Sequence, residues 1–313
     1  MDQLQRYREK LSSIPPPGCG CHVFLLATAN LGILAGLSAD TIFRDIRQSI
    51  PQGSRRIPDK EIHDSLSKAI SDHNYGTYTP RPRPTPAVRD GKAALQKIID
   101  QGRINNEVDL WEFTPVRLMG EPQEDTAVFL SQLFNPTEYV FIGDPYDGTS
   151  VKTVAAWIDD FKNGLKTSPH ICINPLTGLP ADKKAGDGTT LRGDGNIATY
   201  RFCLVEFDTL KREDQIRFWS AVKLPIVALI DSGGKSIHAW LEVSKLATVM
   251  ISEQWTAEIK CRLYDRLLTP LGADGACSNP ARLSRLPGHY RKEKKAWQRL
   301  LWLSTEGKPI CTC

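Results

Sequence analysis

Polar and apolar residues recur at helical spacing in the first part of the chain. In residues 39–50, Ile42, Phe43 and Ile46 fall on one face, and Ser38 can cap the helix at its start. Similar patterns predict the following helical segments: 1–14, 22–37, 39–50 and 60–70. Short helices of this kind favour a small accessory domain over residues 1–78. It is either winged-helix-like or a plain helical bundle used for docking.

Proline then occupies every second position from Pro80 to Pro86. This spacing blocks both helix and sheet and is typical of a stiff polyproline-like spacer. Residues 79–89 are therefore predicted to be a linker between two domains. Its arginines, Arg81 and Arg83, can be read either as phosphate contacts or as solvated linker residues.

Beyond the linker, strand-like and helix-like stretches alternate, which is typical of an α/β layer over residues 90–199. The predicted helices are 92–100, 125–134 and 151–161, and the predicted strands are 139–142 and 170–174. A tryptophan-containing stretch after residue 100 has no regular pattern. The glycine-rich segment 186–195 lacks the spacing of a calcium loop and is predicted to be a flexible connection.

The pattern is clearest from residue 200 to the end of the chain. It predicts strands at 201–207, 226–230, 237–243 and 297–303, and helices at 212–222 and 252–268. The resulting β-α-β-β-α-β order is ferredoxin-like and is also used by RNA-recognition modules. The expected fold class is thus α/β (α+β), with a small all-helical domain in front.

Three acidic residues are candidate metal ligands. Glu206 and Asp208 lie two positions apart at the end of a predicted strand, so they share one face, and Asp274 follows the last predicted helix. Such carboxylates can hold the divalent cations of a two-metal phosphoryl-transfer site. The alternative is that all three are solvated charges at strand ends.

A polar turn between two predicted strands is a candidate phosphate-binding segment: Ser232-Gly-Gly-Lys-Ser-Ile-His238. It is not a P-loop, because Leu229 stands where that motif needs glycine and a strand follows instead of a helix. Ser232, Lys235, Ser236 and His238 can instead grip a triphosphate from a hairpin. The alternative for His238 is a structural role.

Basic residues are concentrated near the C-terminus, although the net charge is only +4. Arg282 and Arg285 lie three positions apart in a loop with proline and glycine, where they can bind phosphates or form salt bridges to a neighbouring domain. The run that follows is a candidate template-binding segment: Arg291, Lys292, Lys294 and Lys295.

Two cysteine pairs at the chain ends offer a further hypothesis. Cys19 and Cys21, with Cys311 and Cys313, could form a zinc clip, or they could be free thiols. The sequence has no apolar run long enough for a membrane span and no apolar signal core at its start, so a cytoplasmic protein without a membrane partner is expected.

Taken together and in this order, Glu206-Phe-Asp208, Ser236-Ile-His238 and Asp274 resemble the three motifs of the archaeo-eukaryotic primase (AEP) superfamily. Ser232–His238 and the segment from Asn279 to Gly288 resemble more closely the primase-polymerases of mobile genetic elements. The similarity is strongest over residues 200–300 and extends weakly to 170–175. Glu206 stands where many members have aspartate, and the helical module precedes the catalytic part.

The resemblance implies primer synthesis on single-stranded DNA from NTPs or dNTPs. It assigns Glu206, Asp208 and Asp274 to two Mg²⁺ or Mn²⁺ ions, and Ser236 and His238, with Lys235, to the incoming triphosphate. A separate helicase or replication initiator is the expected protein partner. Two alternatives remain: a non-catalytic DNA-binding module for replication initiation, and a metal-dependent nuclease.

Overall fold

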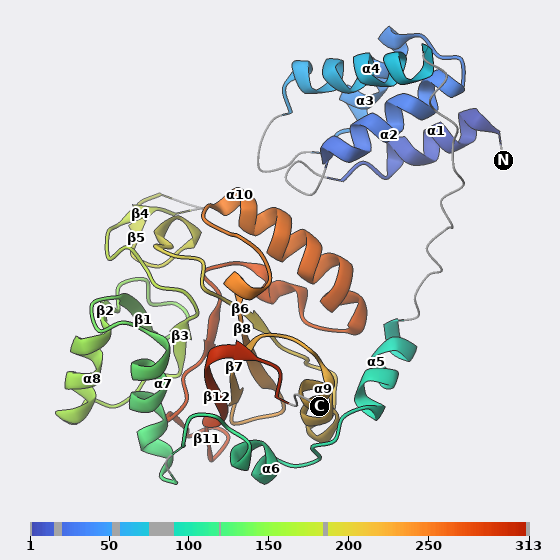
Figure 1. The fold of residues 1–313 in the computed structure, drawn as a ribbon. Helices are drawn as coiled ribbons and strands as arrows, with labels where there is room; N and C mark the ends of the chain where they lie inside the picture. Colours follow the sequence, from blue (N-terminus) through green and yellow to red (C-terminus); the bar gives the residue numbers. More distant parts are fainter. Residues whose placement is uncertain are drawn as a thin grey trace. The chain divides into compact units, whose positions relative to one another are not determined.

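The computed structural model describes residues 2–15, 21–51, 57–74, 91–118, 120–183 and 187–310. The chain divides into two units, Met1–Val88 and Arg89–Cys313, which Figure 1 shows in blue and in green to red. The predicted linker at 79–89 and the cysteines Cys19, Cys311 and Cys313 lie outside the described residues.

Helices account for all of the regular structure described in the first unit: α1 (Gln3–Ser12), α2 (Cys21–Leu34), α3 (Ala39–Ser49) and α4 (Asp59–Asn74). The predicted cap of α3 is present, because the Ser38 hydroxyl accepts the backbone N–H of Thr41 at 3.2 Å. Tyr7, Leu25 and Ile42 are among the side chains buried between these helices. The described residues of this unit contain no strand, so they include no β-wing of a winged helix.

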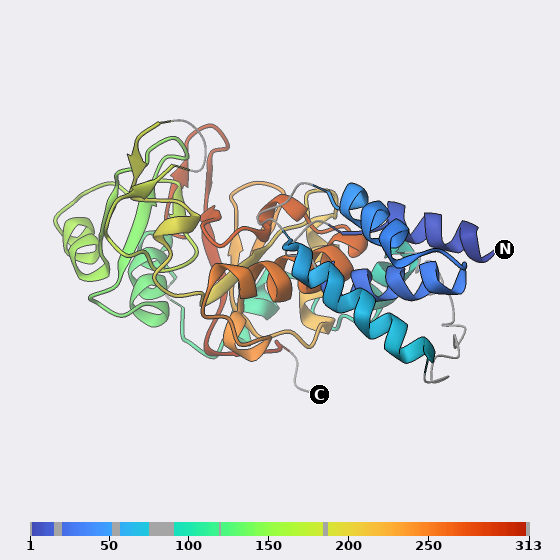
Figure 2. The same cartoon turned by 90° about the horizontal axis from the view of Figure 1, so that it is seen from above.

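The second unit combines helices with two four-stranded sheets. One sheet has the order β2-β1-β3-β9 and the other has the order β12-β7-β8-β6. The two views in Figures 1 and 2 place these sheets side by side. Their strands are β1 (Tyr139–Gly143), β2 (Val151–Thr153), β3 (His170–Cys172), β6 (Phe202–Val205), β7 (Ile226–Asp231), β8 (Ile237–Glu242), β9 (Leu283–Arg285) and β12 (Arg299–Lys308).

Two short hairpins and a set of helices complete this unit. The hairpins pair β4 (Ala181–Asp182) with β5 (Thr189–Thr190), and β10 (Tyr290–Arg291) with β11 (Ala296–Trp297). The helices are α5 (Gly91–Asp100), α6 (Glu107–Glu112), α7 (Asp125–Leu133), α8 (Val154–Lys162), α9 (Arg212–Ala221), α10 (Ser252–Gln254), which continues into the π-helical η4 (Trp255–Leu268), and the short turns η1 (Pro122–Glu124), η2 (Asp194–Asn196), η3 (Val243–Lys245), η5 (Thr269–Leu271) and η6 (Gly275–Ser278).

From residue 200 onward, the principal strands and helices follow one another in the predicted β-α-β-β-α-β order, but the sheet is not ordered as in a ferredoxin-like fold. The first strand of a ferredoxin-like sheet is interior, whereas β6 lies at an edge here and pairs with β8 alone. The hairpin-linked β7 and β8 are the two interior strands of this sheet, and both are buried along almost their whole length. The ferredoxin-like expectation is therefore wrong in its sheet order.

Several predicted boundaries also change. The expected strand 201–207 ends at Val205, so both acids lie beyond it. The expected helix 151–161 begins as β2, which pairs with β1, and only then becomes α8, capped by Thr153. The stretch without a predicted pattern contains α6, whose cap is Asn106. The predicted flexible segment 186–195 contains β5 and the start of η2, with residues 184–186 outside the description.

The core of the second unit surrounds Trp240 on β8. This side chain is fully buried and packs edge-on against Phe129 of α7, with ring centroids 5.0 Å apart. Phe134 and Phe202 complete the aromatic cluster around it. Among the described residues, no helix is both long and apolar enough to span a bilayer.

Buried Asn174 ties the edge strand β6 to the neighbouring sheet. Its Oδ1 accepts the backbone N–H groups of Arg201 (2.7 Å) and Phe202 (2.8 Å). Its Nδ2 donates to the carbonyl oxygens of Phe202 and Pro280, both at 2.9 Å. One side chain thus replaces a missing strand partner for β6 and fixes the loop before β9 beside it.

Candidate active site

The acidic pair of the sequence lies immediately after β6. Phe207, between the two acids, is fully buried and contacts the rings of Phe218 and Trp219 of α9, with centroids 4.9 and 6.0 Å away. This anchor places Glu206 and Asp208 on the opposite side from the core, as the alternation of an extended chain requires. Glu206 is partly buried and Asp208 is exposed.

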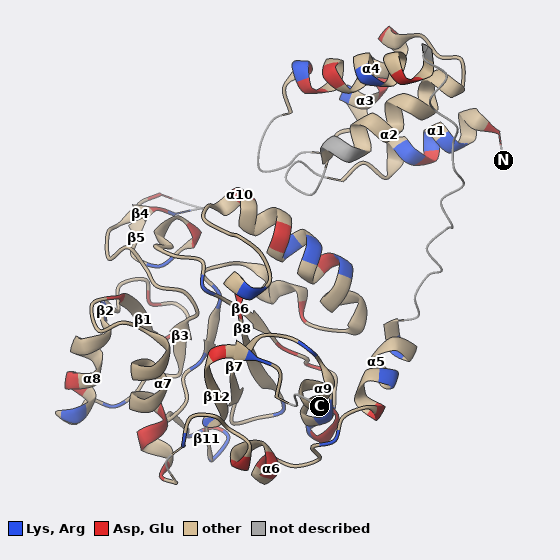
Figure 3. Ribbon diagram, in the orientation of Figure 1, with Lys and Arg blue, Asp and Glu red and all other residues tan. Residues whose placement is uncertain are grey.

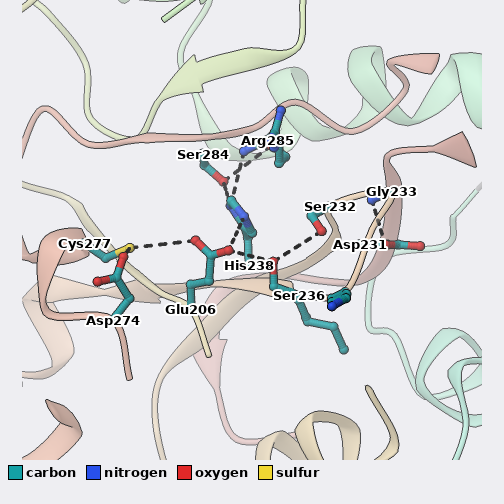
Figure 4. Close-up of polar contacts among 12 residues, drawn as sticks. Glu206, Asp231, Ser232, Gly233, Ser236, His238, Asp274, Cys277, Ser284 and Arg285 are labelled. Atoms are coloured by element: carbon teal, nitrogen blue, oxygen red, sulfur yellow. Dashed lines mark hydrogen bonds and ion pairs between the residues drawn. The ribbon is translucent and has the colours of Figure 1, made fainter. Parts of the chain in front are cut away.

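Asp274 reaches the same place from the far end of the second helical segment. Gly272, with φ of 98°, reverses the chain after η5, and the backbone N–H of Asp274 then donates to the carbonyl oxygen of Glu206 at 2.9 Å. Ligand atoms of Glu206, Asp274 and Cys277 all lie within 4.8 Å of one another. The Cys277 thiol donates to Asp274 Oδ2 at 3.5 Å (Figure 4).

Asp208 is electrostatically coupled to both acids. Its pKa is raised by burial and by the negative charges of Glu206 and Asp274. Arg282 offsets part of this charge, because its Nη2 lies 3.5 Å from Asp274 Oδ2. A carboxylate whose ionisation is opposed by neighbouring carboxylates, as that of Asp208 is, is stabilised in its charged form by a divalent cation.

The two oxygens of Glu206 face different partners. Oε1 accepts the Ser236 hydroxyl at 2.6 Å and lies 3.4 Å from His238 Nε2, while Oε2 faces Cys277. Burial of Glu206 opposes its ionisation, but the hydrogen bonds from His238 and Ser236 and the nearby charge of Arg282 outweigh it and lower the pKa to about 2. Glu206 is therefore an ionised carboxylate with one oxygen fixed and the other turned toward Asp274.

His238 is oriented by strand β9. Its Nδ1 accepts the backbone N–H of Arg285 at 3.3 Å and lies 3.1 Å from the Ser284 hydroxyl. The Ser284 oxygen in turn accepts the indole N–H of Trp240 at 2.8 Å. Because Nδ1 acts as an acceptor, the ring proton is assigned to Nε2, which points at Glu206 (Figure 4).

The turn between β7 and β8 forms the predicted hairpin. The Gly233 N–H donates to Asp231 Oδ1 at 2.8 Å, and Asp231 is in turn held by Arg212 at 2.6 Å. Gly233 has φ of 67°, a conformation that favours glycine, and a Cβ there would crowd Arg291 Cδ at 3.2 Å. Ser232 is buried, with its Oγ 3.3 Å from that of Ser236, whereas Lys235 is exposed.

A cavity of about 510 Å³ opens beside Glu206 and the hairpin, and neither Asp208 nor Asp274 lines it. Glu206, Ser232, Lys235, Ser236 and His238 line it on one side, and its basic lining residues are Arg192, Lys235, Arg282, Arg285, Arg291 and Lys294. In the described part of the chain, Arg285 forms no ion pair with a carboxylate. Burial and the nearby charge of Arg291 lower the pKa of Arg285. A polyanion would relieve this clustering of positive charge.

The predicted template-binding residues separate into two pairs. Arg291 and Lys294 line the cavity, and Arg291 also donates to the Ser232 carbonyl oxygen at 3.1 Å. Lys292 and Lys295 are exposed at the tip of the β10–β11 hairpin. Figure 3 shows Lys and Arg segments beside β11. The structure therefore places half of this group with the candidate triphosphate residues.

Three further residues of the site did not emerge from the sequence pattern. Cys277 follows Asp274 by three positions, Arg192 lies in the glycine-rich segment that was predicted to be a connection, and His170 begins β3. No sequence motif links these three residues to the other residues of the site. Only the pairing of β3 with β1 and β9 brings His170 opposite Arg285.

His170 provides a prediction of pH-dependent stability. Burial and the positive charge of Arg285 lower its pKa from 6.5 to about 4. The unfolded chain therefore binds a proton at this residue at a higher pH than the folded chain does. We expect neutral His170 to contribute fully to the free energy of unfolding above about pH 6.5, and this contribution to be lost as the pH falls toward 4.

This expectation can be measured by urea unfolding at a series of pH values, followed by tryptophan fluorescence. All seven tryptophans lie after residue 89, so the signal reports on the second unit alone. The His170→Asn variant should show a smaller loss of stability between pH 6.5 and 4. Parallel curves for the two proteins would contradict the expectation.

The donor set of the acidic cluster fits a hard divalent cation. Mg²⁺ and Mn²⁺ prefer carboxylate oxygens, which Glu206 and Asp274 supply within 4.8 Å of each other. Asp208, the third predicted ligand, is not part of this close group in the structure. The Cys277 sulfur is a softer donor in the same cluster. The zinc hypothesis falls mainly on Cys19, Cys311 and Cys313, outside the described residues, while Cys21 is a buried cysteine of the first helical core.

The fold and side chains define a mixed helix-and-sheet protein with an acidic cluster beside a cavity rich in cations. No protein-family model and no curated protein matches the chain. Among solved structures, it is similar to the AEP domain of the Cyanophage S-2L primase-polymerase, with a TM-score of 0.38 and 17% sequence identity. This similarity covers 60% of the present chain and 93% of the phage domain. The function proposed below depends on the side chains of the site.

Proposed function

We propose that Arg89–Cys313 is a primase-polymerase that synthesises primers on single-stranded DNA from NTPs or dNTPs by metal-dependent nucleotidyl transfer. One observation supports this most strongly. Glu206 and Asp274, far apart in the sequence, lie within 4.8 Å of each other, next to a cavity of about 510 Å³ lined by cations and by the Ser232–His238 hairpin. Acids for metal and cations for phosphate thus share one site.

Glu206, Asp208 and Asp274 would hold the divalent cations. The chemistry that two bound Mg²⁺ or Mn²⁺ ions would supply is a lower pKa for the attacking 3′-hydroxyl and charge stabilisation of the leaving pyrophosphate. Ser236 and His238 hold Glu206 Oε1, so Oε2 remains directed toward Asp274. This arrangement gives the two residues a positioning role toward a metal ligand, in addition to their proposed contact with the nucleotide.

The cavity would receive the triphosphate. Lys235, Arg285 and Arg291 line it together with Glu206 and supply positive charge. Guanidinium groups bind phosphate oxygens in pairs, which fixes the direction of the phosphate chain as well as its affinity. The hairpin and β9 would therefore orient the α-phosphate toward the acids, where positioning contributes much of the rate.

The exposed lysines of the β10–β11 hairpin, Lys292 and Lys295, would contact the template backbone. Binding through phosphates releases counterions, so the affinity should fall steeply with salt. A separate helicase or replication initiator would supply the single-stranded template in the cytoplasm, and the resemblance of the motifs suggests a mobile genetic element as the source.

The proposal is tested by a primer-synthesis assay on single-stranded DNA with Mg²⁺ or Mn²⁺, with ribo- and deoxyribonucleotides supplied separately. Labelled products that depend on template, nucleotide and divalent cation are expected. Shortening of labelled DNA without added nucleotide would identify a nuclease instead. Salt-sensitive DNA binding without either reaction would identify a non-catalytic replication-initiation module.

A further inference from the structure

A second cavity of about 720 Å³ adjoins the first and is not used by the proposed triphosphate site. The loop between β1 and β2, the β4–β5 hairpin and the segment after β5 form most of its lining. Arg192, Asn279 and Ala281 line both cavities. The two cavities therefore share one wall, next to the site where nucleotidyl transfer would occur.

Arg192 is a fixed cation in that wall. Its Nη2 donates to the Pro145 carbonyl oxygen at 2.7 Å, and its guanidinium lies over the ring of Phe141, 4.8 Å from the centroid. Its buried Nε has no hydrogen-bond partner among the described residues, and no carboxylate of the described chain pairs with it. A rigid guanidinium without an acidic partner between two cavities suits a phosphate group shared by two nucleotide units.

Tyr146 supplies an aromatic surface at the same cavity. It lies in the loop between β1 and β2, lines the second cavity, and is 100% exposed. An exposed aromatic ring beside a cationic groove is the combination that single-stranded nucleic acids use, because every base can stack on it. The residue has no packing role that would explain a tyrosine here.

Two carboxylates also line the second cavity, and one of them is engaged. Asp194 accepts the Ala281 backbone N–H at 3.3 Å and the Asn279 side-chain amide at 3.4 Å, so it holds the shared wall in place. Asp182 is exposed. The remaining lining is mainly glycine, threonine and serine, which leaves room for a sugar and offers hydrogen bonds to it.

We propose that the second cavity binds a second nucleotide unit of a DNA strand, with Arg192 on the phosphate next to the triphosphate site and Tyr146 against the base. The inference rests on the proposed function, since it extends the same site. The nucleotide can come from the template or from the 3′ end of the primer. Both have the same chemistry, and the experiment distinguishes them.

The test compares the whole protein with its Tyr146→Ala variant in binding labelled oligonucleotides, measured by fluorescence anisotropy. Loss of one stacked base should weaken binding about 5- to 150-fold. Weakened binding of an unprimed oligonucleotide would assign the cavity to the template. Weakened binding of only a primed template would assign it to the primer end. Unchanged affinity for both would overturn the proposal.

Three further variants control the interpretation. Tyr146→Phe should bind as the wild type, because it keeps the ring, and Phe113→Ala, which removes an exposed ring that lines neither cavity, should also have no effect. Arg192→Gln should reduce the slope of log affinity against log salt by about 0.7, the value for one phosphate contact in a single strand. An unchanged slope would contradict the role of Arg192.

Failure of this proposal can be separated from failure of the proposed function. Binding that depends on Tyr146 in a protein that incorporates no nucleotide would retain the strand site and reject the polymerase. Conversely, template-dependent incorporation by the wild type, together with unchanged DNA binding by Tyr146→Ala, would retain the polymerase and reject the strand site.

Discussion

Nucleotide incorporation is expected to fall by about 10³-fold or more in the Asp274→Asn variant, because removing a metal-ligating carboxylate costs several kcal/mol of transition-state stabilisation. The substitution preserves the local structure. Asparagine can still accept the Ala276 N–H, which Asp274 Oδ1 accepts at 2.9 Å, and the backbone bond to Glu206 is unaffected. The measurement is single-nucleotide incorporation on a primed template with Mn²⁺.

The same variant separates catalysis from binding. Its affinity for single-stranded DNA should be unchanged or slightly higher, because a negative charge has been removed near the bound strand. Asp265→Asn is a matched control: it removes an exposed carboxylate of η4 that lines neither cavity, and its activity should be normal. Full activity of Asp274→Asn would reject the metal-dependent mechanism.

The second large effect concerns stability. Asn174→Leu is expected to lower the free energy of unfolding of the second unit by about 3 kcal/mol or more, since it leaves several buried backbone groups unpaired at about 1–3 kcal/mol each. The groups affected are the N–H groups of Arg201 and Phe202 and the carbonyl oxygens of Phe202 and Pro280. Urea unfolding followed by tryptophan fluorescence measures the loss.

Leucine keeps the branched outline of the asparagine side chain but is larger, so overpacking at this fully buried position adds to the loss of the hydrogen bonds. Asn163→Leu, at the exposed end of α8, serves as the control and should change stability by no more than about 0.5 kcal/mol. A comparable effect at both positions would show that Asn174 does not hold β6 in place.

The local elements were largely predictable because each depends on neighbours in the sequence. The period of apolar residues located β6, β7, β8 and the helices between them, and Ser38 correctly marked the start of α3. The hairpin after β7 followed from two glycines between apolar runs. Errors occurred where a partner strand decides the outcome, as at β2, which pairs with β1 and delays the start of α8.

The candidate site was predictable only in its composition. The sequence identified three acids, a polar hairpin and paired arginines, and their roles remain proposals that the variants above can test. The sequence did not identify Arg192, because no motif relates its position to that of the hairpin; the two meet only at the cavity. It also grouped Arg291 with Lys292 and Lys295, although only Arg291 of these three lines the cavity.

The sequence by itself determined which residues can ligate a cation or bind phosphate, since that property belongs to each side chain, and it determined the local elements that carry them. The tertiary structure alone decided that β6 lies at a sheet edge, that Asp274 lies against Glu206, and that two cavities share Arg192. The reason is that these relations depend on strand order and on buried contacts between distant segments, which no local pattern of residues encodes.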